Sequence, residues 1–436
     1  MKVTLLDLAP KGPYHIYKDL AAGFGTKLIV GKSLRGRMIE WAKRKFVRLP
    51  LTSYGFLNAI FRQFGHEVSY VQNDLKRAAE SDLVLTQSSL VDFHNEIKTL
   101  ETLKKLGAPA VGIFGPVATL FPDIYLKAAD LVLIGEPEYA ALHIAESGKT
   151  LSGKVVSAPV KNLDELPFAS WEGFPVRDYS YFPSLKKGPV LPVLGSRGCF
   201  APCEYCAYRT NFKWRMRAPE KVVEELIYLK ERYKIKSALF RDPMFTGNNN
   251  RAQQIAELMI EKRVKLEWAC ETALEFLNEK LIDLLYRAGL RSINVGVESG
   301  NDEVLFDVQR RATQQRQSEH LVAYCAKRGI RISAFYCIGL PQDTEKSIHE
   351  TIHYAKRLNT HVATFNVFTP YPGTPLYERV KHEIFDHDWT HYTSFTPVHR
   401  HPVLSPEQLE TLREKAFLSF YFRPKYFTSF LKRMLV

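Results

Sequence analysis

The sequence predicts an α/β protein with a doubly wound parallel sheet at its N-terminal end, followed by an open partial barrel of six strand–helix units and a helical C-terminal segment. Short apolar runs alternate with segments of helical apolar spacing, a pattern typical of parallel sheets. In the second half of the chain this alternation recurs roughly every 30 residues. Six units are too few to close an eightfold barrel. At 436 residues the chain is long enough for two or three domains.

The first domain is expected over residues 1–151. Its strands are predicted at residues 2–7, 67–71, 82–86, 110–114 and 130–134, and its helices at residues 54–64 and 93–106. Two of the strands lead into Gly-Pro or Gly-Glu-Pro turns. Ligands of doubly wound sheets bind at the carboxyl ends of the strands, so a binding site is predicted beside these turns.

Residues 152–189 are predicted to be a linker, because their repeated prolines cannot sustain a long helix. The partial barrel is expected over residues 190–377 and a helical, basic and aromatic extension over residues 378–436. The barrel strands are predicted at residues 190–194, 237–241, 266–271, 292–298, 331–338 and 363–368, and its helices at residues 220–233, 251–262, 278–288, 317–327 and 345–358. Barrel enzymes carry their catalytic residues at the carboxyl ends of the strands.

The composition is that of a globular protein, with 45% hydrophobic and 25% charged residues. No apolar run reaches the roughly 18 residues that a membrane-spanning helix needs. The formal net charge of +13 is spread along the chain, with denser basic stretches at residues 32–48 and at the C-terminal end. Without a nucleic-acid-binding motif, nucleic acid is not expected as a partner. Six cysteines without a secretion signal indicate a reducing, cytoplasmic setting.

The C-terminal end is aromatic and basic from Phe422 onward. Such a segment can lie on the anionic inner face of a membrane, or it can pack across the barrel mouth with its basic residues in water; the sequence leaves both open. Five histidines precede this end at irregular spacing, which does not make a helical metal-binding face. Most of them are expected on the surface, and one could serve a substrate as a base; they are His382, His387, His391, His399 and His401.

Three cysteines follow the first predicted barrel strand at close spacing: Cys199, Cys203 and Cys206. Thiolates are the ligands of iron–sulfur clusters, and three of them leave one iron of a four-iron cube free to bind a small molecule. A zinc site would need a fourth ligand nearby, and none is present. Disulfides are not expected in a chain with few cysteines and no secretion signal. The remaining cysteines, which are expected in the core, are Cys270, Cys325 and Cys337.

The cysteine spacing, with the aromatic Tyr205 directly before the third cysteine, resembles the signature of the radical S-adenosylmethionine enzymes. The resemblance implies a 4Fe–4S cluster on the three cysteines and S-adenosylmethionine on the free iron. It also implies a partial barrel and a reductant such as flavodoxin or ferredoxin. In this family the reduced cluster splits S-adenosylmethionine into methionine and a 5′-deoxyadenosyl radical, which takes hydrogen from an unactivated C–H bond.

Further strand ends resemble the same family and imply contacts with S-adenosylmethionine. By this resemblance Tyr205 belongs to the cofactor site, Asp242 would contact the amino group, Glu298 the ribose hydroxyls and Ile338 the adenine. From the residues alone, Asp242 could equally cap a turn, and Glu298 could form a structural salt bridge. Cys337 has a small chance of being a catalytic thiol, and no catalytic residue is assigned.

The whole chain resembles the subgroup in which a cobalamin-binding domain precedes the radical barrel. The resemblance rests on the order of the elements, on residues 65–68 (GHEV) and 130–137 (DLVLIGEP), and on the loop at residues 371–375 (YPGTP). The chain departs from many cobalamin proteins because it lacks Asp-x-His-x-x-Gly, and residues 11–49 are basic and Gly-rich, unlike the first helix of a compact domain. The alternative is a nucleotide-fold domain that only packs on the barrel.

The function implied by this resemblance is cobalamin-dependent methyl transfer to a lipid, an isoprenoid or another small metabolite. One alternative is cobalamin-linked cyclisation or ring rearrangement without methylation. An alternative of another class is an iron–sulfur electron carrier or a metal-binding protein without catalysis. An RNA-modifying methylthiotransferase is disfavoured, because a second set of three cysteines and an RNA-binding module are not visible in the sequence.

Overall fold

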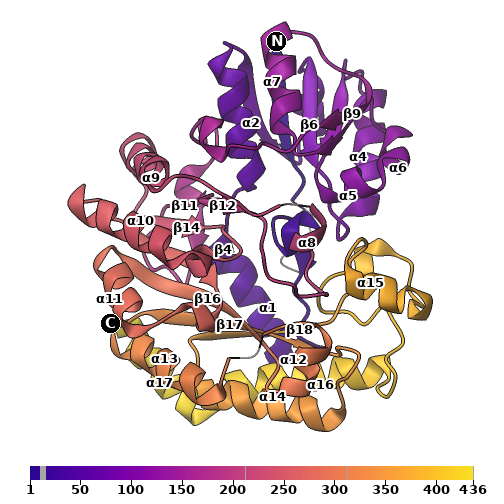
Figure 1. Ribbon diagram of the computed structural model, residues 1–436. Helices are drawn as coiled ribbons and strands as arrows, with labels where there is room; N and C mark the ends of the chain where they lie inside the picture. Colours follow the sequence, from indigo (N-terminus) through magenta and orange to yellow (C-terminus); the bar gives the residue numbers. More distant parts are fainter. Residues whose placement is uncertain (10–15, 212, 312, 436) are drawn as a thin grey trace.

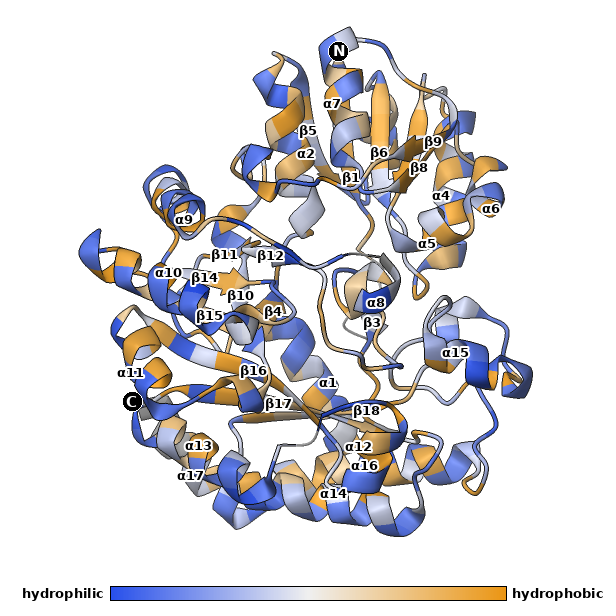
Figure 2. Cartoon of the chain, viewed as in Figure 1, coloured by the Kyte–Doolittle hydropathy of each residue, from blue (hydrophilic) through white to orange (hydrophobic). Residues whose placement is uncertain are grey.

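The computed structural model describes residues 1–9, 16–211, 213–311 and 313–435, and the side chains of residues 211 and 431–435 lie outside the description. Two parallel six-stranded sheets form the two halves of the molecule (Figure 1). Figure 2 shows strands of both sheets in the orange of apolar residues, while the surrounding helices alternate between blue and orange. This pattern is expected for sheets covered by amphipathic helices. The predicted α/β fold is confirmed.

The first sheet has the strand order β5-β1-β6-β7-β8-β9 and is entirely parallel. The bounds of its strands are β1 (Lys2–Asp7), β5 (Glu67–Gln72), β6 (Leu83–Gln87), β7 (Val111–Phe114), β8 (Leu131–Gly135) and β9 (Gly153–Ser157). Its helices are α2 (Thr52–Gln63), α3 (Leu75–Ala79), α4 (Phe93–Lys105), α5 (Pro116–Leu120), α6 (Pro122–Leu126) and α7 (Glu138–Ser147). The strand order reverses between β1 and β6, which makes the sheet doubly wound.

Strand β9 corrects the predicted start of the linker. It falls within residues 152–189, yet it pairs with β8 along its whole length and completes the first sheet. The strand is hard to predict because Lys154 and Val156 are exposed, so this edge strand lacks the continuous apolar run of its neighbours. The rest of the segment crosses to the second half through η2 (Leu163–Glu165), η3 (Val176–Asp178) and β10 (Ser180–Tyr181).

The second sheet has the sequential order β11-β14-β15-β16-β17-β18, as expected for an open partial barrel. Its strands are β11 (Val190–Val193), β14 (Ser237–Phe240), β15 (Glu267–Thr272), β16 (Leu290–Glu298), β17 (Arg331–Ile338) and β18 (Val362–Val367). Its helices are α9 (Pro219–Tyr233), α10 (Asn249–Glu261), α11 (Glu279–Arg287), α12 (Asp302–Asp307), α13 (Gln315–Lys327) and α14 (Glu345–Leu358). Short elements lie at its carboxyl end: β12 (Ser196–Arg197), α8 (Tyr208–Asn211), β13 (Arg215–Met216), η4 (Phe245–Gly247) and η5 (Leu274–Phe276).

Residues 16–49 form a strap that leaves the first sheet and runs along the second half of the molecule. Its elements are β2 (Ile16–Tyr17), η1 (Ala21–Gly23), β3 (Thr26–Lys27), α1 (Leu34–Phe46) and β4 (Val47–Arg48). The strap is anchored at its start, where Lys18 Nζ lies 2.9 Å from Asp92 and 2.8 Å from Glu96 in a buried cluster. Figure 1 shows the indigo helix α1 among the orange elements of the barrel. This placement explains why residues 11–49 lack the pattern of a compact domain's first helix.

The C-terminal extension consists of α15 (Pro375–Val380), η6 (Lys381–Glu383), η7 (Trp389–His391), α16 (Pro406–Tyr421) and α17 (Pro424–Leu435). The tail does not cross the barrel mouth. Tyr421 Oη donates to Ala363 O at 2.7 Å, and Tyr426 Oη donates to His361 O at 3.0 Å, so the tail packs at the amino end of β18. In the described part of the chain, no helix is both long and apolar enough to span a bilayer.

Two of the histidines expected on the surface are buried. His399 is 1% exposed and lies edge-on to the Phe368 ring, and burial lowers its pKa to about 4. His401 Nε2 lies 2.9 Å from Leu340 O, and its Nδ1 accepts from two backbone N–H groups. Both residues fasten the C-terminal extension to the ends of β17 and β18, a role that irregular sequence spacing does not reveal.

Candidate active site

The three cysteines follow β11 and β12 and line one cavity of about 200 Å³ at the carboxyl end of the barrel. Cys203 is buried, and Cys199 and Cys206 are half-buried. Within the described residues, no three His, Cys, Asp or Glu side chains converge on a point where they could hold a single metal ion. A 4Fe–4S cube gives each thiolate its own iron, so its ligands surround a volume instead of meeting at a point. The arrangement suits a cluster and disfavours a mononuclear zinc site.

The cysteine loop is fixed by the C-terminal part of the barrel. Glu204, inside the loop, forms an ion pair with Arg379 at 2.6 Å, and its backbone oxygen accepts from Leu376 N at 3.1 Å. Leu376 follows the YPGTP loop, whose Thr374 caps the start of α15. The loop at residues 371–375 therefore positions Leu376, which holds the cysteine loop at Glu204.

Glu298 ends β16 in a strained backbone conformation and lies in the same cavity as the cysteines. Its φ is 65°, and the pairing of β16 with β17 is irregular between Gly296 and Glu298. A Cβ atom at Gly296 would overlap the Glu298 carboxylate, so a side chain there would displace that carboxylate. Burial raises the pKa of the Glu298 carboxyl. The charge of Arg310 and a hydrogen bond from Tyr205 act in the opposite direction and offset part of this rise. Strained residues of this kind persist only where their surroundings hold them, which is common at functional sites.

A second cavity of about 320 Å³ occupies the interior of the barrel and adjoins the first. Tyr205, Cys206, Glu298 and Phe335 line both cavities. The strap closes the barrel cavity on one side with residues that the sequence did not single out: Tyr17, Leu20, Thr26, Leu28, Lys43, Val47 and Leu49. The cavity is suited to an apolar substrate with a few polar groups.

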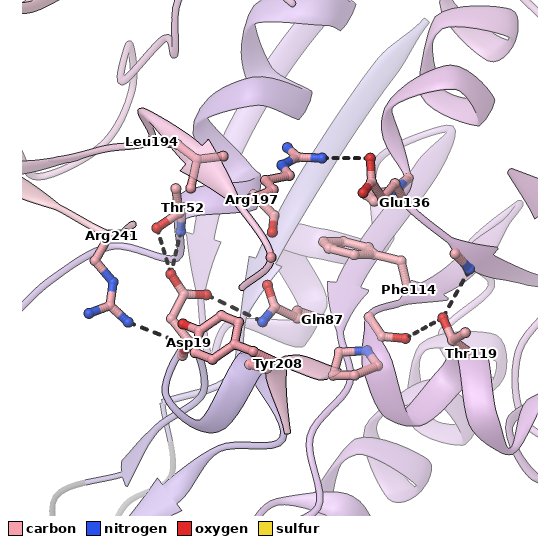
Figure 3. A pocket seen from close by; sticks show the side chains of 18 of the residues that line it. Asp19, Thr52, Gln87, Phe114, Thr119, Glu136, Leu194, Arg197, Tyr208 and Arg241 are labelled. Atoms are coloured by element: carbon pink, nitrogen blue, oxygen red, sulfur yellow. Dashed lines mark hydrogen bonds and ion pairs between the residues drawn. The ribbon is translucent and has the colours of Figure 1, made fainter. Parts of the chain in front are cut away.

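A third cavity, of about 190 Å³, lies between the two sheets (Figure 3). Gln87, Phe114 and Gly135, at the ends of β6, β7 and β8, line one side of it, and Arg197 and Arg241 from the barrel line the other. Asp19 joins the sides, since it accepts from Thr52 N at 2.7 Å and its backbone oxygen accepts from Arg241 at 3.3 Å. The cavity lies beside the Gly-Pro and Gly-Glu-Pro turns, where the sequence predicts a binding site.

The family comparison decides what this geometry represents. The model of the radical S-adenosylmethionine superfamily matches residues 193–355, a range that contains the cysteine loop, Glu298 and five of the six barrel helices in full. The chain therefore contains a radical S-adenosylmethionine domain over these residues.

Relatives of this radical enzyme resemble it over most of its length. The uncharacterized methyltransferase PH0819 of Pyrococcus horikoshii is 29% identical over 367 residues, which are 79% of this chain and 78% of the relative. The anaerobic magnesium-protoporphyrin IX monomethyl ester cyclase of Rubrivivax gelatinosus is 23% identical over 380 residues, or 78% of this chain and 68% of the cyclase.

Two solved structures share the fold of this radical enzyme across both sheets. TsrM from Kitasatospora setae, a radical S-adenosylmethionine methyltransferase with cobalamin and a [4Fe–4S] cluster bound, has a TM-score of 0.67 and 15% identity. The match covers 97% of this chain and 89% of TsrM. OxsB, a cobalamin-dependent radical enzyme, has a TM-score of 0.58 and 13% identity, over 95% of this chain and 55% of OxsB.

Membership in the radical S-adenosylmethionine superfamily implies a 4Fe–4S cluster, and the residues present fit one. All three donors are thiols that face one cavity. Burial raises the pKa of each thiol, that of Cys206 to about 12. The protein alone therefore holds them protonated, and the charge of bound iron would favour the thiolate, as it does at other metal sites. Asn294 Oδ1, a buried acceptor without a hydrogen-bond partner among the described residues, belongs to a side chain that lines the same cavity.

Asp242, for which the radical-enzyme resemblance predicts a cofactor contact, accepts hydrogen bonds in the turn after β11. It is fully buried, and its two oxygens accept from Gly195 N at 2.7 Å and Ser196 Oγ at 2.8 Å. It is absent from the linings of all three cavities, although the next residue, Pro243, lines two of them. The geometry therefore supports the alternative, in which Asp242 caps the turn after β11. The cofactor contact of Asp242 stays a prediction.

Ile338 lies away from the described cavities of the radical-enzyme site, and its predicted adenine contact stays a prediction. It is fully buried in the main core and lines none of the three cavities. Side chains alternate along a strand, and on β17 it is Phe335 and Cys337 that line the barrel cavity. Ile338 lies two residues after Tyr336, so both side chains are on the face of β17 that the helices cover. Tyr205 and Glu298 do line the cluster cavity, and their cofactor contacts stay predictions.

Proposed function

We propose that this radical S-adenosylmethionine enzyme transfers a methyl group from cobalamin to an unactivated carbon of a lipid, an isoprenoid or another small metabolite. One observation carries the proposal: Tyr208 lines all three cavities. The cluster site, the barrel interior and the cavity between the sheets therefore meet at one residue. A methyl donor, a radical source and a substrate need this proximity, because reacting groups must be held close together.

The cluster and S-adenosylmethionine, when bound, supply a carbon radical that removes hydrogen from the substrate. The protein's part is to bind and orient. Cys199, Cys203 and Cys206 would hold the cluster, and Glu298 would accept hydrogen bonds from the ribose. Arg310 donates to Gly296 O at 2.9 Å and pairs with Glu275 at 3.1 Å, so it holds the backbone next to Glu298 in place.

The cavity between the sheets is the proposed cobalamin site. Gln87 Oε1 and Glu138 Oε2 are buried acceptors without a partner among the described residues, and both side chains line this cavity. Cobalamin carries many side-chain amides, whose N–H groups suit such acceptors. Among the described residues that line this cavity there is no His, Met or Cys.

Methyl transfer is also supported by relatives. Besides PH0819, cytidylyl-2-hydroxyethylphosphonate methyltransferase of Streptomyces wedmorensis is 28% identical over 230 residues, which cover 49% of this chain. The apolar barrel cavity favours a substrate with substantial apolar surface. The cyclase relative supports the alternative outcome, cyclisation without methylation.

The test is anaerobic purification from cells supplied with cobalamin, followed by measurement of iron and cobalt per chain. We expect about four iron atoms and one cobalt. The enzyme is then incubated with S-adenosylmethionine carrying a deuterated methyl group, a reductant, and an extract of apolar metabolites. Product labelled with the methyl group, together with 5′-deoxyadenosine and S-adenosylhomocysteine, supports the proposal. Iron and 5′-deoxyadenosine without cobalt or labelled product would contradict it.

A further inference from the structure

Helix α1 spans the open side of the partial barrel. At its start, Glu414 of α16 accepts from Ser33 N at 3.0 Å, and α16 packs on β18, one edge of the sheet. At its end, β4 pairs with β10, and Leu49 and Tyr181 pack against the core cluster that contains Val190 of β11, the other edge. The helix therefore bridges the two edges that a closed barrel would join.

The outer face of α1 combines apolar and basic side chains. Leu34, Met38 and Trp41 are 78%, 55% and 51% exposed, and their spacing places them on one side of the helix. Phe46 at its end is 37% exposed. Exposed cations surround this stripe: Lys32, Arg35, Arg37, Arg44, Lys45 and Arg48. The single acidic residue of the stretch, Glu40, is buried and accepts from Val30 N at 2.6 Å.

This face differs from a chance exposure of single apolar residues, which is common on protein surfaces. Three large apolar side chains on successive turns of one helix cost solvation free energy when nothing covers them. The cations contribute packing as well, since Lys45 lies 5.0 Å from the Trp41 ring centroid and Arg35 lies 5.2 Å from the Phe422 ring centroid. The second contact brings the basic, aromatic tail next to the same surface.

The opposite side of α1 faces the barrel cavity. Lys43 of α1 lines that cavity, as do Val47 and Leu49 just after the helix, together with Glu298 and Cys206 of the cluster site. One short helix thus separates the barrel interior from the basic and apolar face outside.

We propose that the outer face of α1 docks on an anionic lipid bilayer. Cations on such a face are attracted to anionic headgroups, while large apolar side chains and a tryptophan enter the interface. A nucleic acid would match the charge but not the stripe of Leu34, Met38 and Trp41. Docking places the barrel cavity beside the bilayer, which suits delivery of an apolar substrate. The proposal goes beyond methyl transfer and does not depend on it.

The experiment measures sedimentation of the anaerobically reconstituted full-length protein with vesicles of phosphatidylglycerol and phosphatidylcholine, and with phosphatidylcholine alone. We expect binding to the anionic vesicles that weakens as salt rises. The charge variant Arg37→Glu/Lys45→Glu and the apolar variant Leu34→Ser/Met38→Ser/Trp41→Ser should each bind at least tenfold more weakly. A matched charge control, Lys105→Glu/Lys149→Glu, changes exposed lysines of the first domain by the same amount and should bind like the wild type. A matched apolar control, Val156→Ser/Val403→Ser, replaces side chains that are 78% and 64% exposed and should also bind like the wild type.

Iron content and the thermal midpoint show whether each variant is folded, and all the substituted side chains are exposed. Brominated phosphatidylcholine in the anionic vesicles provides a second measurement, because it should quench wild-type fluorescence more than that of Trp41→Phe. Equal binding by the wild type and both α1 variants would overturn the proposal. So would loss of binding in the charge variant alone, with full competition by heparin, because that pattern describes a general polyanion site.

Discussion

The two sheets share a strand count and a parallel direction, yet they make different kinds of site. In the first sheet the order reverses between β1 and β6, and the cavity lies outside the sheet, beside the turns that follow the strands. In the second sheet the order is sequential, and the strands enclose a cavity in the barrel interior. Strand order, more than strand number, decides where a parallel sheet can hold a ligand.

The chemistry of the two sites follows the same division. The barrel site concentrates thiols, a strained carboxylate and an arginine: Cys203, Glu298 and Arg310 all line its cluster cavity. The cavity of the first sheet offers glycine-bearing turns and unpartnered acceptors, but no thiol or imidazole. Reactive groups thus belong to the barrel, and the first sheet is suited to holding a large polar cofactor.

The largest effect is expected from loss of a cluster ligand, which should remove iron from the barrel site and leave cobalt at the other site unchanged. Cys203→Ala should reduce iron from about four per chain to almost none and abolish 5′-deoxyadenosine formation, because the cluster loses a ligand. Cobalt per chain should not change, since Cys203 is not part of the cavity between the sheets. The control is Cys270→Ala, which removes a fully buried core thiol that lines no cavity and should leave the iron content intact. Full iron in Cys203→Ala would contradict the cluster assignment.

A second prediction concerns S-adenosylmethionine alone. Glu298→Gln should raise the dissociation constant of S-adenosylmethionine about tenfold or more, since hydrogen bonds to a charged acceptor are lost, while iron is unchanged. Equilibrium dialysis with labelled S-adenosylmethionine measures this. Ile338→Val should bind like the wild type, because Ile338 lies in the core. Weaker binding in the Ile338 variant would show that the resemblance placed the adenine contact correctly after all.

A smaller effect is expected at the first sheet. Gln87→Leu should weaken cobalamin binding about fivefold, the effect of losing one neutral hydrogen bond, and leave S-adenosylmethionine cleavage unaltered. Titration with hydroxocobalamin, followed by absorbance, measures the affinity. Unchanged affinity in this variant would argue against a cobalamin amide at Gln87. Thr390→Val, a change outside the cavities, is the matched control.

The last prediction concerns acid and the barrel side of the molecule, where His399 lies. Burial lowers the pKa of His399 to about 4 from an ordinary 6.5, so below pH 6.5 protons bind preferentially to the unfolded chain. Stability of the region containing His399 should fall by about 2 kcal/mol between pH 7 and pH 5. In His399→Leu this loss should be smaller. Urea unfolding followed by hydrogen exchange in peptides around residue 399 measures it, and an identical pH slope in the variant would refute the cause.

The sequence specified the parts of the site that depend on local spacing. Cys199, Cys203 and Cys206 lie within eight residues of one another, so their convergence follows from one loop. Glu298 could be predicted as a site residue because it ends a predicted strand and Gly300 lies two residues after it. The apolar runs likewise predicted most of the strands of both sheets, since a strand buried on both faces must be apolar throughout.

Tertiary structure decided what local pattern leaves open. Asp242 had the residue type for a cofactor contact, but its orientation depends on Gly195 and Ser196, which lie on another strand end. Ile338 lines none of the three cavities, and an uninterrupted apolar strand carries no sign of which side chains point inward. The sequence did not predict that the strap closes one side of the barrel cavity, because the contacts of the strap with α16 and β10 join residues far apart in the sequence. Sequence spacing fixes neighbours along the chain, whereas burial and long-range contacts determine which side of each element meets the ligand.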